Sequence, residues 1–276
     1  AAALVLSQLR PEASVVCHAF DLHHARAIMR NLAANGAAPS FVHDPWALPP
    51  PDLASGAAPQ RYAVACTASL PPGPYSAALF MSTPGTLTGE LLLDQLEDIH
   101  ENLADGGTCL LACEGASGPL LKQLRALFGN LSIRSDRSGL ICAVATRRAG
   151  LARRRDFSAT FEASLPGGPR LTLHSLPGVF CHRRPDAGGL ALAEIASREP
   201  LGSAARALDL GCGCGLVGLL LAQAQPGLRV TFADSHARAL AATRLNIGAA
   251  ESSGHTLLLS DTGTGETGFD LFVANP

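Results

Sequence analysis

Charged residues, and basic residues above all, are scarce in this sequence. Its 276 residues contain 21 Lys and Arg against 23 Asp and Glu, which gives a formal net charge of −2. Without a basic excess the chain lacks the overall positive charge typical of nucleic-acid binders, although local patches matter more than the sum. Hydrophobic residues reach 47% while charged residues stay at 16%, which excludes intrinsic disorder and predicts packed globular cores.

Metal-ligand pairs and membrane segments are also lacking. The eight cysteines form no Cys-x-x-Cys pair and the nine histidines form no pair four residues apart, so neither zinc nor a disulfide framework is expected. The apolar start at residues 1–6 is too short for a membrane span and lacks the basic segment of a signal peptide. We expect a cytoplasmic monomer that binds neither metal nor membrane.

A glycine loop organises the second half of the chain. Residues 206–210 are typical of a buried strand and residues 216–224 of a helix, and between them stand Gly211, Gly213 and Gly215. Glycine lets the backbone turn sharply and come close to a ligand where a Cβ would collide. Such a loop alone is also found in plain turns, so its weight depends on the strands that follow.

Two further strands end in carboxylates. Asp234 ends the strand 228–234, 23 residues after Gly211, where it can bind ribose hydroxyls, cap the next helix, or do both. The strand 255–261 ends in Asp261, which suits either an adenine amino group or a turn. Since open α/β sheets bind ligands at the carboxyl ends of their strands, these side chains are expected at one edge.

A fourth strand begins at Phe269 and ends in Asn275-Pro276. The side-chain oxygen of Asn275 and the backbone carbonyl of Pro276 are both hydrogen-bond acceptors, and the strand brings them to the same edge of the sheet. Proline also removes an N–H donor that would compete. The alternative for this pair is an ordinary turn.

The second half resembles the small-domain type of S-adenosylmethionine-dependent methyltransferases through four motifs in order: Asp209-Leu-Gly-Cys-Gly-Cys-Gly215, Phe232-Ala-Asp234, Ser260-Asp261 and Asn275-Pro276. Residues 173–180 and 186–192 resemble, within that type, the ribosomal RNA small-subunit methyltransferase C group. The resemblance is strong over 170–276 and weak over 1–148. It departs at Gly189, where the family usually has Ser or Thr, and the second proline and the aromatic residue of the family motif are not in this sequence.

The resemblance implies that the chain uses S-adenosyl-L-methionine to methylate the exocyclic N2 of a guanine, with ribosomal RNA or the small ribosomal subunit as its partner. It implies Asn275 and Pro276 as the catalytic residues. It implies that the cofactor is bound by Asp209, Gly211, Gly213, Gly215, Asp234, Ser235 and Asp261. Two alternatives stay open: a methyltransferase acting on a protein glutamine or on adenine N6, and a truncated methyltransferase-like protein without catalysis.

An internal duplication is also predicted, because helix, proline, strand and aspartate recur, with Pro11, Asp21 and Asp44 matching Pro226, Asp234 and Asp261. We expect an α/β fold of two tandem Rossmann-like methyltransferase domains, residues 1–148 and 157–276. Residues 149–156 are predicted to form a basic linker that either contacts RNA phosphates or is simply solvated.

The two copies are expected to differ in completeness. The first copy lacks a glycine loop and has Thr83 where the second has Asn275. The second copy stops after its fourth strand, which would leave a bare sheet edge and make residues 157–276 marginally stable alone. Because the sequence also lacks an initiating Met, we expect a fragment of a longer protein.

Overall fold

The structure is a computed structural model, and it describes residues 2–43, 61–82, 89–114, 118–137, 139–148, 154–248 and 254–275. The chain divides into two compact units: residues 1–68 together with 158–276 form the first, and residues 69–157 form the second. Most of the predicted linker, together with Asp44, Thr83 and Pro276, lies outside the described residues. The division into copies at residues 149–156 stays a prediction.

The strands of the second half form one sheet in the order β12-β11-β10-β13, and every neighbouring pair is parallel. The strands are β10 (Arg206–Leu210), β11 (Arg229–Asp234), β12 (Thr256–Leu259) and β13 (Leu271–Ala274). Numbered by their order in the sequence, these strands follow 3-2-1-4, which is the order of the first four strands in the Rossmann arrangement 3-2-1-4-5-6. Strand order reverses between β10 and β13, and ligands bind at that crevice in such sheets. The Rossmann-like fold predicted for this half is confirmed.

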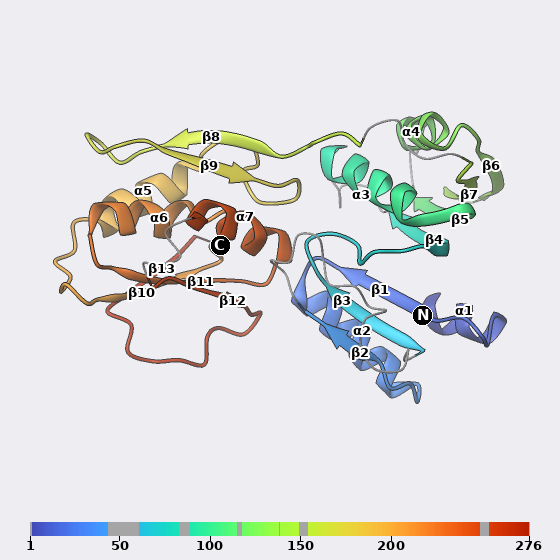
Figure 1. Ribbon diagram of the computed structural model, residues 1–276, viewed down its shortest axis with the longest axis horizontal. Helices are drawn as coiled ribbons and strands as arrows, with labels where there is room; N and C mark the ends of the chain where they lie inside the picture. Colours follow the sequence, from blue (N-terminus) through green and yellow to red (C-terminus); the bar gives the residue numbers. More distant parts are fainter. Residues whose placement is uncertain are drawn as a thin grey trace. The chain divides into compact units, whose positions relative to one another are not determined.

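Helices α5 (Ala187–Ala196), α6 (Leu216–Ala224) and α7 (Ala237–Ile247) lie on one face of this sheet (Figure 1). They follow an antiparallel hairpin of β8 (Ala159–Ala163) and β9 (Leu171–Ser175). The helix predicted after the glycine loop, over residues 216–224, is confirmed as α6. Together these elements place the glycine loop, the end of β11 and the end of β13 at one edge.

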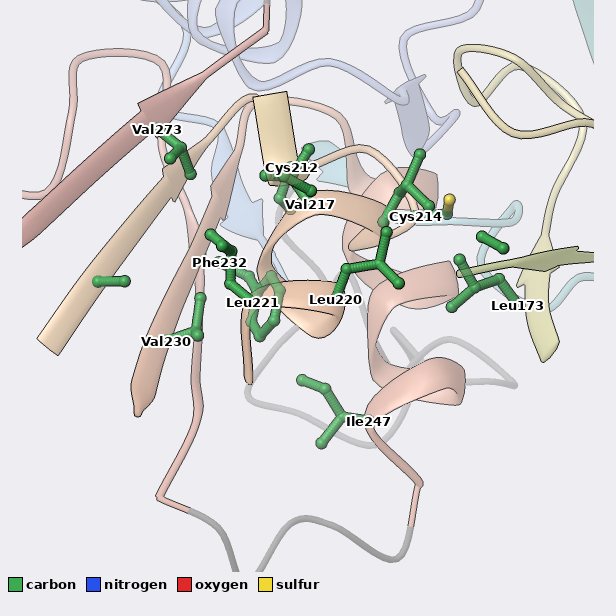
Figure 2. Packing of buried hydrophobic residues seen from close by; sticks show 14 of the residues in the cluster. Leu173, Cys212, Cys214, Val217, Leu220, Leu221, Val230, Phe232, Ile247 and Val273 are labelled. Carbon is green, nitrogen blue, oxygen red and sulfur yellow. The ribbon is translucent and has the colours of Figure 1, made fainter. Parts of the chain in front are cut away.

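The N-cap of helix α6 is Gly215, whose φ of 84° is in the left-handed region. Its C-cap is Gln225, and the residue after it is a proline, which cannot continue the helix. Its buried side chains recur one turn apart, at residues 216 and 217 and again at 220 and 221, so one side of the helix packs into the core. Leu220, Leu221 and Phe232 are fully buried there, and Figure 2 shows them side by side between helix and strands. This packing holds the glycine loop against the carboxyl end of β10.

The N-terminal part of the first unit is a second parallel sheet, in the order β1-β3-β2. Its elements are α1 (Ala2–Leu9), β1 (Val15–Ala19), α2 (Leu22–Ala34), β2 (Ser40–Val42) and β3 (Tyr62–Cys66). The predicted strands and the helix between them are confirmed. However, β3 lies between β1 and β2, whereas their supposed counterparts β11 and β12 pair directly. The tandem duplication therefore stays a prediction.

A short antiparallel bridge joins the N-terminal sheet to the segment between β11 and α7. Leu22 N donates to Ser235 O at 2.8 Å, and Ala237 N donates to Phe20 O at 2.7 Å. Ala237 is fully buried in the N-terminal core, and the buried Arg238 beside it donates to Ala68 O at 2.8 Å. The N-terminal residues thus form part of the unit that carries the glycine loop.

The second unit has a mixed sheet in the order β4-β5-β7-β6, with β4 parallel to β5 and the other pairs antiparallel. Its elements are β4 (Tyr75–Ser82), α3 (Gly89–Asn102), β5 (Leu103–Glu114), α4 (Gly118–Phe128), β6 (Ser132–Arg137) and β7 (Leu140–Thr146). Strands β6 and β7 form an antiparallel hairpin at one edge of this sheet.

Two arginines of the predicted basic linker are described, and both bind acidic side chains of α3. Arg154 contacts Asp98 and Glu101, each at 3.1 Å, and Arg155 contacts Glu97. Burial of Asp98 and Glu97 makes these more than solvated surface pairs. The positive charges of Arg154 and Arg155 are therefore paired with carboxylates of the second unit.

We predict that Gly218→Ala destabilises the first unit. A Cβ at this position would lie 2.4 Å from Phe232 Cε1 and 2.9 Å from Asp209 Oδ2, which is closer than atoms in a packed core tolerate. Such overpacking costs roughly 1–3 kcal/mol, to be measured by urea denaturation. Gly202→Ala is the matched control, since its Cβ would meet nothing within 4 Å. Equal stability of the two variants would contradict the packing argument.

Candidate active site

A cavity of about 320 Å³ lies at the carboxyl ends of β10, β11 and β13. Of the site residues predicted from the sequence, those that line it are Asp209, Gly211, Gly213, Asp234 and Asn275. Three of the four motifs thus meet at one place, as expected from the carboxyl ends of parallel strands. The predicted residue Pro276 follows Asn275 but lies outside the described residues.

The glycine loop has a backbone that only glycine adopts easily. Gly211, Gly213 and Gly215 have φ of 73°, 57° and 84°, all in the left-handed region. A Cβ on Gly211 or Gly213 would meet no protein atom within 4 Å, so their backbone faces open space. Gly215 differs, because its Cβ would lie 3.0 Å from Thr243 Cγ2 and it does not line the cavity.

Asp209 lies beneath the loop and is 3% exposed. Its Oδ2 accepts a hydrogen bond of 2.9 Å from Gly218 N, at the start of α6. Burial raises the pKa of this carboxyl to about 7, and the nearby charge of Asp234 acts in the same direction. Asp209 can therefore change its charge near neutral pH.

Asp234 joins the end of β11 to the loop. Its Oδ2 accepts from Gly213 N at 2.9 Å and its Oδ1 accepts from His236 N at 2.8 Å. Burial raises the pKa of Asp234, and the two backbone donors offset part of that rise. The predicted capping role of Asp234 is wrong, because the N-cap of α7 is His236 and no side-chain hydrogen bond caps this helix. Each oxygen keeps a lone pair that a hydroxyl in the cavity could use.

Ser235 and Asp261, two predicted cofactor residues, contact the N-terminal part of the unit instead of the cavity. The Ser235 hydroxyl donates to Asp21 Oδ2 at 2.7 Å, and Asp261 forms an ion pair with Arg26 of α2. Neither residue lines the cavity. Their binding roles, like that of Gly215, stay predictions.

His236 lines the cavity and was missed in the sequence. Its Nδ1 is buried without a hydrogen-bond partner in the described parts of the chain. Burial lowers the pKa of His236 to about 4, so the imidazole is neutral at physiological pH. A buried polar atom without a partner is costly unless a ligand satisfies it. No sequence pattern pointed to this residue, because its environment depends on the ring of Phe20, 5.7 Å away.

The segment before α5 supplies further cavity residues that sequence reasoning did not select as site residues, among them Phe180 and Asp186. Phe180 lines the cavity and is 71% exposed, and Cys181 and Arg183 beside it have left-handed φ of 52° and 77°. Such backbone is uncommon for non-glycine residues and often marks functional loops. Asp186 is the N-cap of α5, and Asn275 Nδ2 donates to its Oδ2 at 2.5 Å.

The cavity suits a cofactor that contains an adenosine. The open glycine backbone offers close approach to a ligand, and Asp234 offers acceptors for hydroxyls. No group of three potential metal ligands is found among the described residues. Within the same residues, no helix is long and apolar enough to cross a membrane.

Comparison with known proteins agrees with this geometry. Residues 170–276 match the family model described as methyltransferase small domain. The matched range begins at the β8–β9 hairpin and includes the glycine loop, the ends of β10, β11 and β13, and Asn275. The methyltransferase small domain thus supplies most of the cavity wall.

Curated relatives match the same half of the chain. The ribosomal RNA small subunit methyltransferase C of Pseudomonas putida is 38% identical over 116 residues, which are 42% of this chain and 34% of that protein. The protein of the same name from Haemophilus influenzae is 33% identical over 106 residues, 38% of this chain and 31% of that protein. The matched region therefore spans about a third of each relative.

A solved structure resembles nearly the whole chain. The T. thermophilus 16S rRNA N2 methyltransferase (RsmC), in complex with AdoMet and guanosine, aligns with a TM-score of 0.70 at 22% identity. The alignment covers 98% of this chain and 66% of that chain. This likeness extends the shared methyltransferase fold to the N-terminal half, which the family model does not match.

We predict that Asp209→Asn removes a pH-dependent loss of stability. A pKa raised to about 7 means that the folded state keeps a proton that the unfolded state releases above its ordinary pKa near 3.8. Wild-type stability should therefore fall, relative to the variant, as pH rises toward 7, and then level off. Between about pH 5 and about pH 8 the difference should change by on the order of 2 kcal/mol in urea denaturation. A difference that does not depend on pH would contradict the assignment.

Proposed function

We propose that this chain binds S-adenosyl-L-methionine in the cavity and transfers its methyl group to the exocyclic N2 of a guanine in ribosomal RNA. The observation that carries the proposal is the meeting of the glycine loop, Asp234 and the Asn275 amide in one cavity. The names of the relatives support the RNA substrate, and the neighbour solved with AdoMet and guanosine supports the pairing of cofactor and base.

In this proposal the cofactor lies along the carboxyl edge of the sheet. The loop backbone at Gly211 and Gly213 and the carboxyl of Asp209 surround the methionine part, and Asp234 accepts from the ribose hydroxyls. Ser235 and Asp261 complete the adenosine side, which requires Asp261 to share or release its ion pair with Arg26. The cofactor supplies a methyl group already activated by its attachment to a sulfonium.

The protein's contribution to the transfer is geometric. A guanine N2 amine is a weak nucleophile because its lone pair is delocalised into the ring, so it must be held in line with the methyl group. Asn275 Oδ1 and the Pro276 carbonyl accept its two N–H groups and turn the lone pair toward the methyl. A guanine within a duplex would first be flipped out, which costs a few kcal/mol. Because the proposed substrate is ribosomal RNA or the small ribosomal subunit, we propose that the protein acts in the cytoplasm, as a monomer.

We expect Asp234→Ala to weaken cofactor binding by ~1.5–3 kcal/mol, the range for loss of a charged hydrogen-bond partner. The measurement is calorimetric titration with S-adenosylmethionine and S-adenosylhomocysteine. Asp270→Ala is the control, because Asp270 also accepts a backbone N–H, from Arg206 at 2.8 Å, at the other end of β10. Unchanged affinity in Asp234→Ala would remove Asp234 from the site.

We also expect transfer of a tritiated methyl group to small-subunit ribosomal RNA, with the label recovered as N2-methylguanine. Asn275→Ala should abolish the transfer and leave cofactor affinity unchanged, since the amide contacts the substrate amine. Label on protein glutamine or on adenine N6 would favour the alternative substrates. Cofactor binding without transfer to any of these substrates would support a non-catalytic chain.

A further inference from the structure

We propose that Asp186 is a positioning residue that fixes the orientation of the Asn275 amide, so that its carbonyl oxygen faces the substrate amine. The inference rests on the proposed function, in which Asn275 Oδ1 accepts from an exocyclic N–H group. It adds a residue, 89 positions away in sequence, that decides which end of the amide the substrate meets.

The first step of the argument is the chemistry of the pair. Asn275 Nδ2 lies 2.5 Å from Asp186 Oδ2 and donates a hydrogen bond to this carboxylate. Hydrogen bonds with an ionised acceptor are stronger than those between neutral groups. An ionised carboxylate only accepts hydrogen bonds, whereas an amide has one donor end and one acceptor end. The NH₂ group of Asn275 must therefore face Asp186, and its carbonyl oxygen must face away from that carboxylate.

The second step is that Asp186 is itself held in place. Its Oδ2 accepts from Gly189 N at 2.7 Å, which makes it the N-cap of α5, and its Oδ1 accepts from Cys181 Sγ at 3.6 Å. These donors come from both sides of Asp186 in the chain. The hydrogen bond from Gly189, followed by that from Asn275, lowers the pKa of Asp186, so it remains an acceptor at neutral pH.

The third step is the space around the amide. A Cβ on Gly188 would lie 3.3 Å from Asn275 Oδ1 and 3.7 Å from its Nδ2, so the first turn of α5 runs along this amide. Because Gly188 has no side chain, the amide fits against the helix while its edge remains at the cavity. Helix α5 thus presents both the carboxylate that orients Asn275 and the surface on which the amide lies.

The consequence for the reaction follows from the symmetry of the amide. The last torsion of an asparagine is broad and roughly two-fold, so without Asp186 both orientations would be populated. In the wrong orientation an NH₂ group faces the amine of the substrate, and two donors meet. With Asp186 in place the acceptor is already oriented before the base arrives, and the orienting hydrogen bond increases the negative charge on Oδ1.

The test is an exchange of the two side chains, followed by transfer of a tritiated methyl group to small-subunit RNA. Asp186→Asn lets the Asn275 amide turn, and Asn275→Asp places two carboxylates in contact, so each should lower kcat by about 100-fold, as expected for a misplaced reacting group. The double exchange restores one donor and one outward acceptor and should recover most of the loss. Cofactor affinity should stay unchanged in every variant.

Asp186→Ser is the control for a purely structural role. Serine is also a good N-cap, so it should keep α5 stable in thermal denaturation, but its side chain is too short to reach Asn275. This variant should lose kcat like Asp186→Asn while its KM for the cofactor stays the same. If Asp186→Ser keeps wild-type kcat, or the double exchange is as slow as the single variants, the proposal is overturned.

A second measurement does not depend on activity. The side-chain NH₂ signal of Asn275, identified by its absence in Asn275→Asp, should be protected from hydrogen exchange in the wild type and unprotected in Asp186→Ser. Equal protection in both would overturn the orientation by Asp186. If the wild type transfers no methyl group to any RNA, the proposed function fails, and this signal alone decides whether Asp186 holds Asn275.

Discussion

The hydrogen bonds between carboxylates and glycine amides are the interactions on which the rest of this site depends. Asp209 binds Gly218 N at the start of α6, and Asp234 binds Gly213 N within the loop. Each bond joins a strand end to the backbone that follows β10. Since left-handed glycines are intrinsically free in conformation, these anchors give the loop one geometry out of many. The cavity exists because the loop is held in that geometry.

The unit that contains this loop is not confined to the matched methyltransferase small domain. The bridge from Phe20 and Leu22 to the segment after β11 fixes the backbone on either side of His236. Ala237 is part of the N-terminal core, and Ser235 donates to Asp21. Within this unit the first 68 residues therefore support the backbone beside His236, which lines the cavity. The marginal stability expected for residues 157–276 alone stays a prediction.

Much of the site could be predicted from the sequence because it depends on local rules. Strand periodicity, the glycines and the position of a residue at a strand end were enough to bring Asp209, Asp234 and Asn275 to one cavity. The sequence predicts a binding role less well for a side chain that also contacts a residue far away in the sequence. Asp261 is bound by Arg26, 235 positions away, and no local pattern reveals such a partner.

The same limit applied to residues that the sequence did not single out. Asp186 is the N-cap of α5, and its contact with Asn275 depends on how α5 and β13 pack, which the sequence does not reveal. His236 gained its buried and unpaired nitrogen from the N-terminal bridge. Strand order in the N-terminal sheet likewise depended on β3, which a repeat of helix and strand could not place.

Two buried carboxyls of the cavity suit a cationic ligand. Burial disfavours the charged forms of Asp209 and Asp234. The charge of Asp234 raises the pKa of Asp209 further, and the charge of Asp21 raises the pKa of Asp234 further. A positive charge in the cavity would favour both ionised forms and lower both pKa values. S-adenosylmethionine carries such charges on its sulfonium and its amino group. In the proposed complex, binding of this cofactor and loss of the proton from Asp209 are therefore linked. Without the cofactor, the buried Asp209 carboxyl lowers the stability of the folded state near neutral pH. With the cofactor bound, its charge interacts favourably with the ligand.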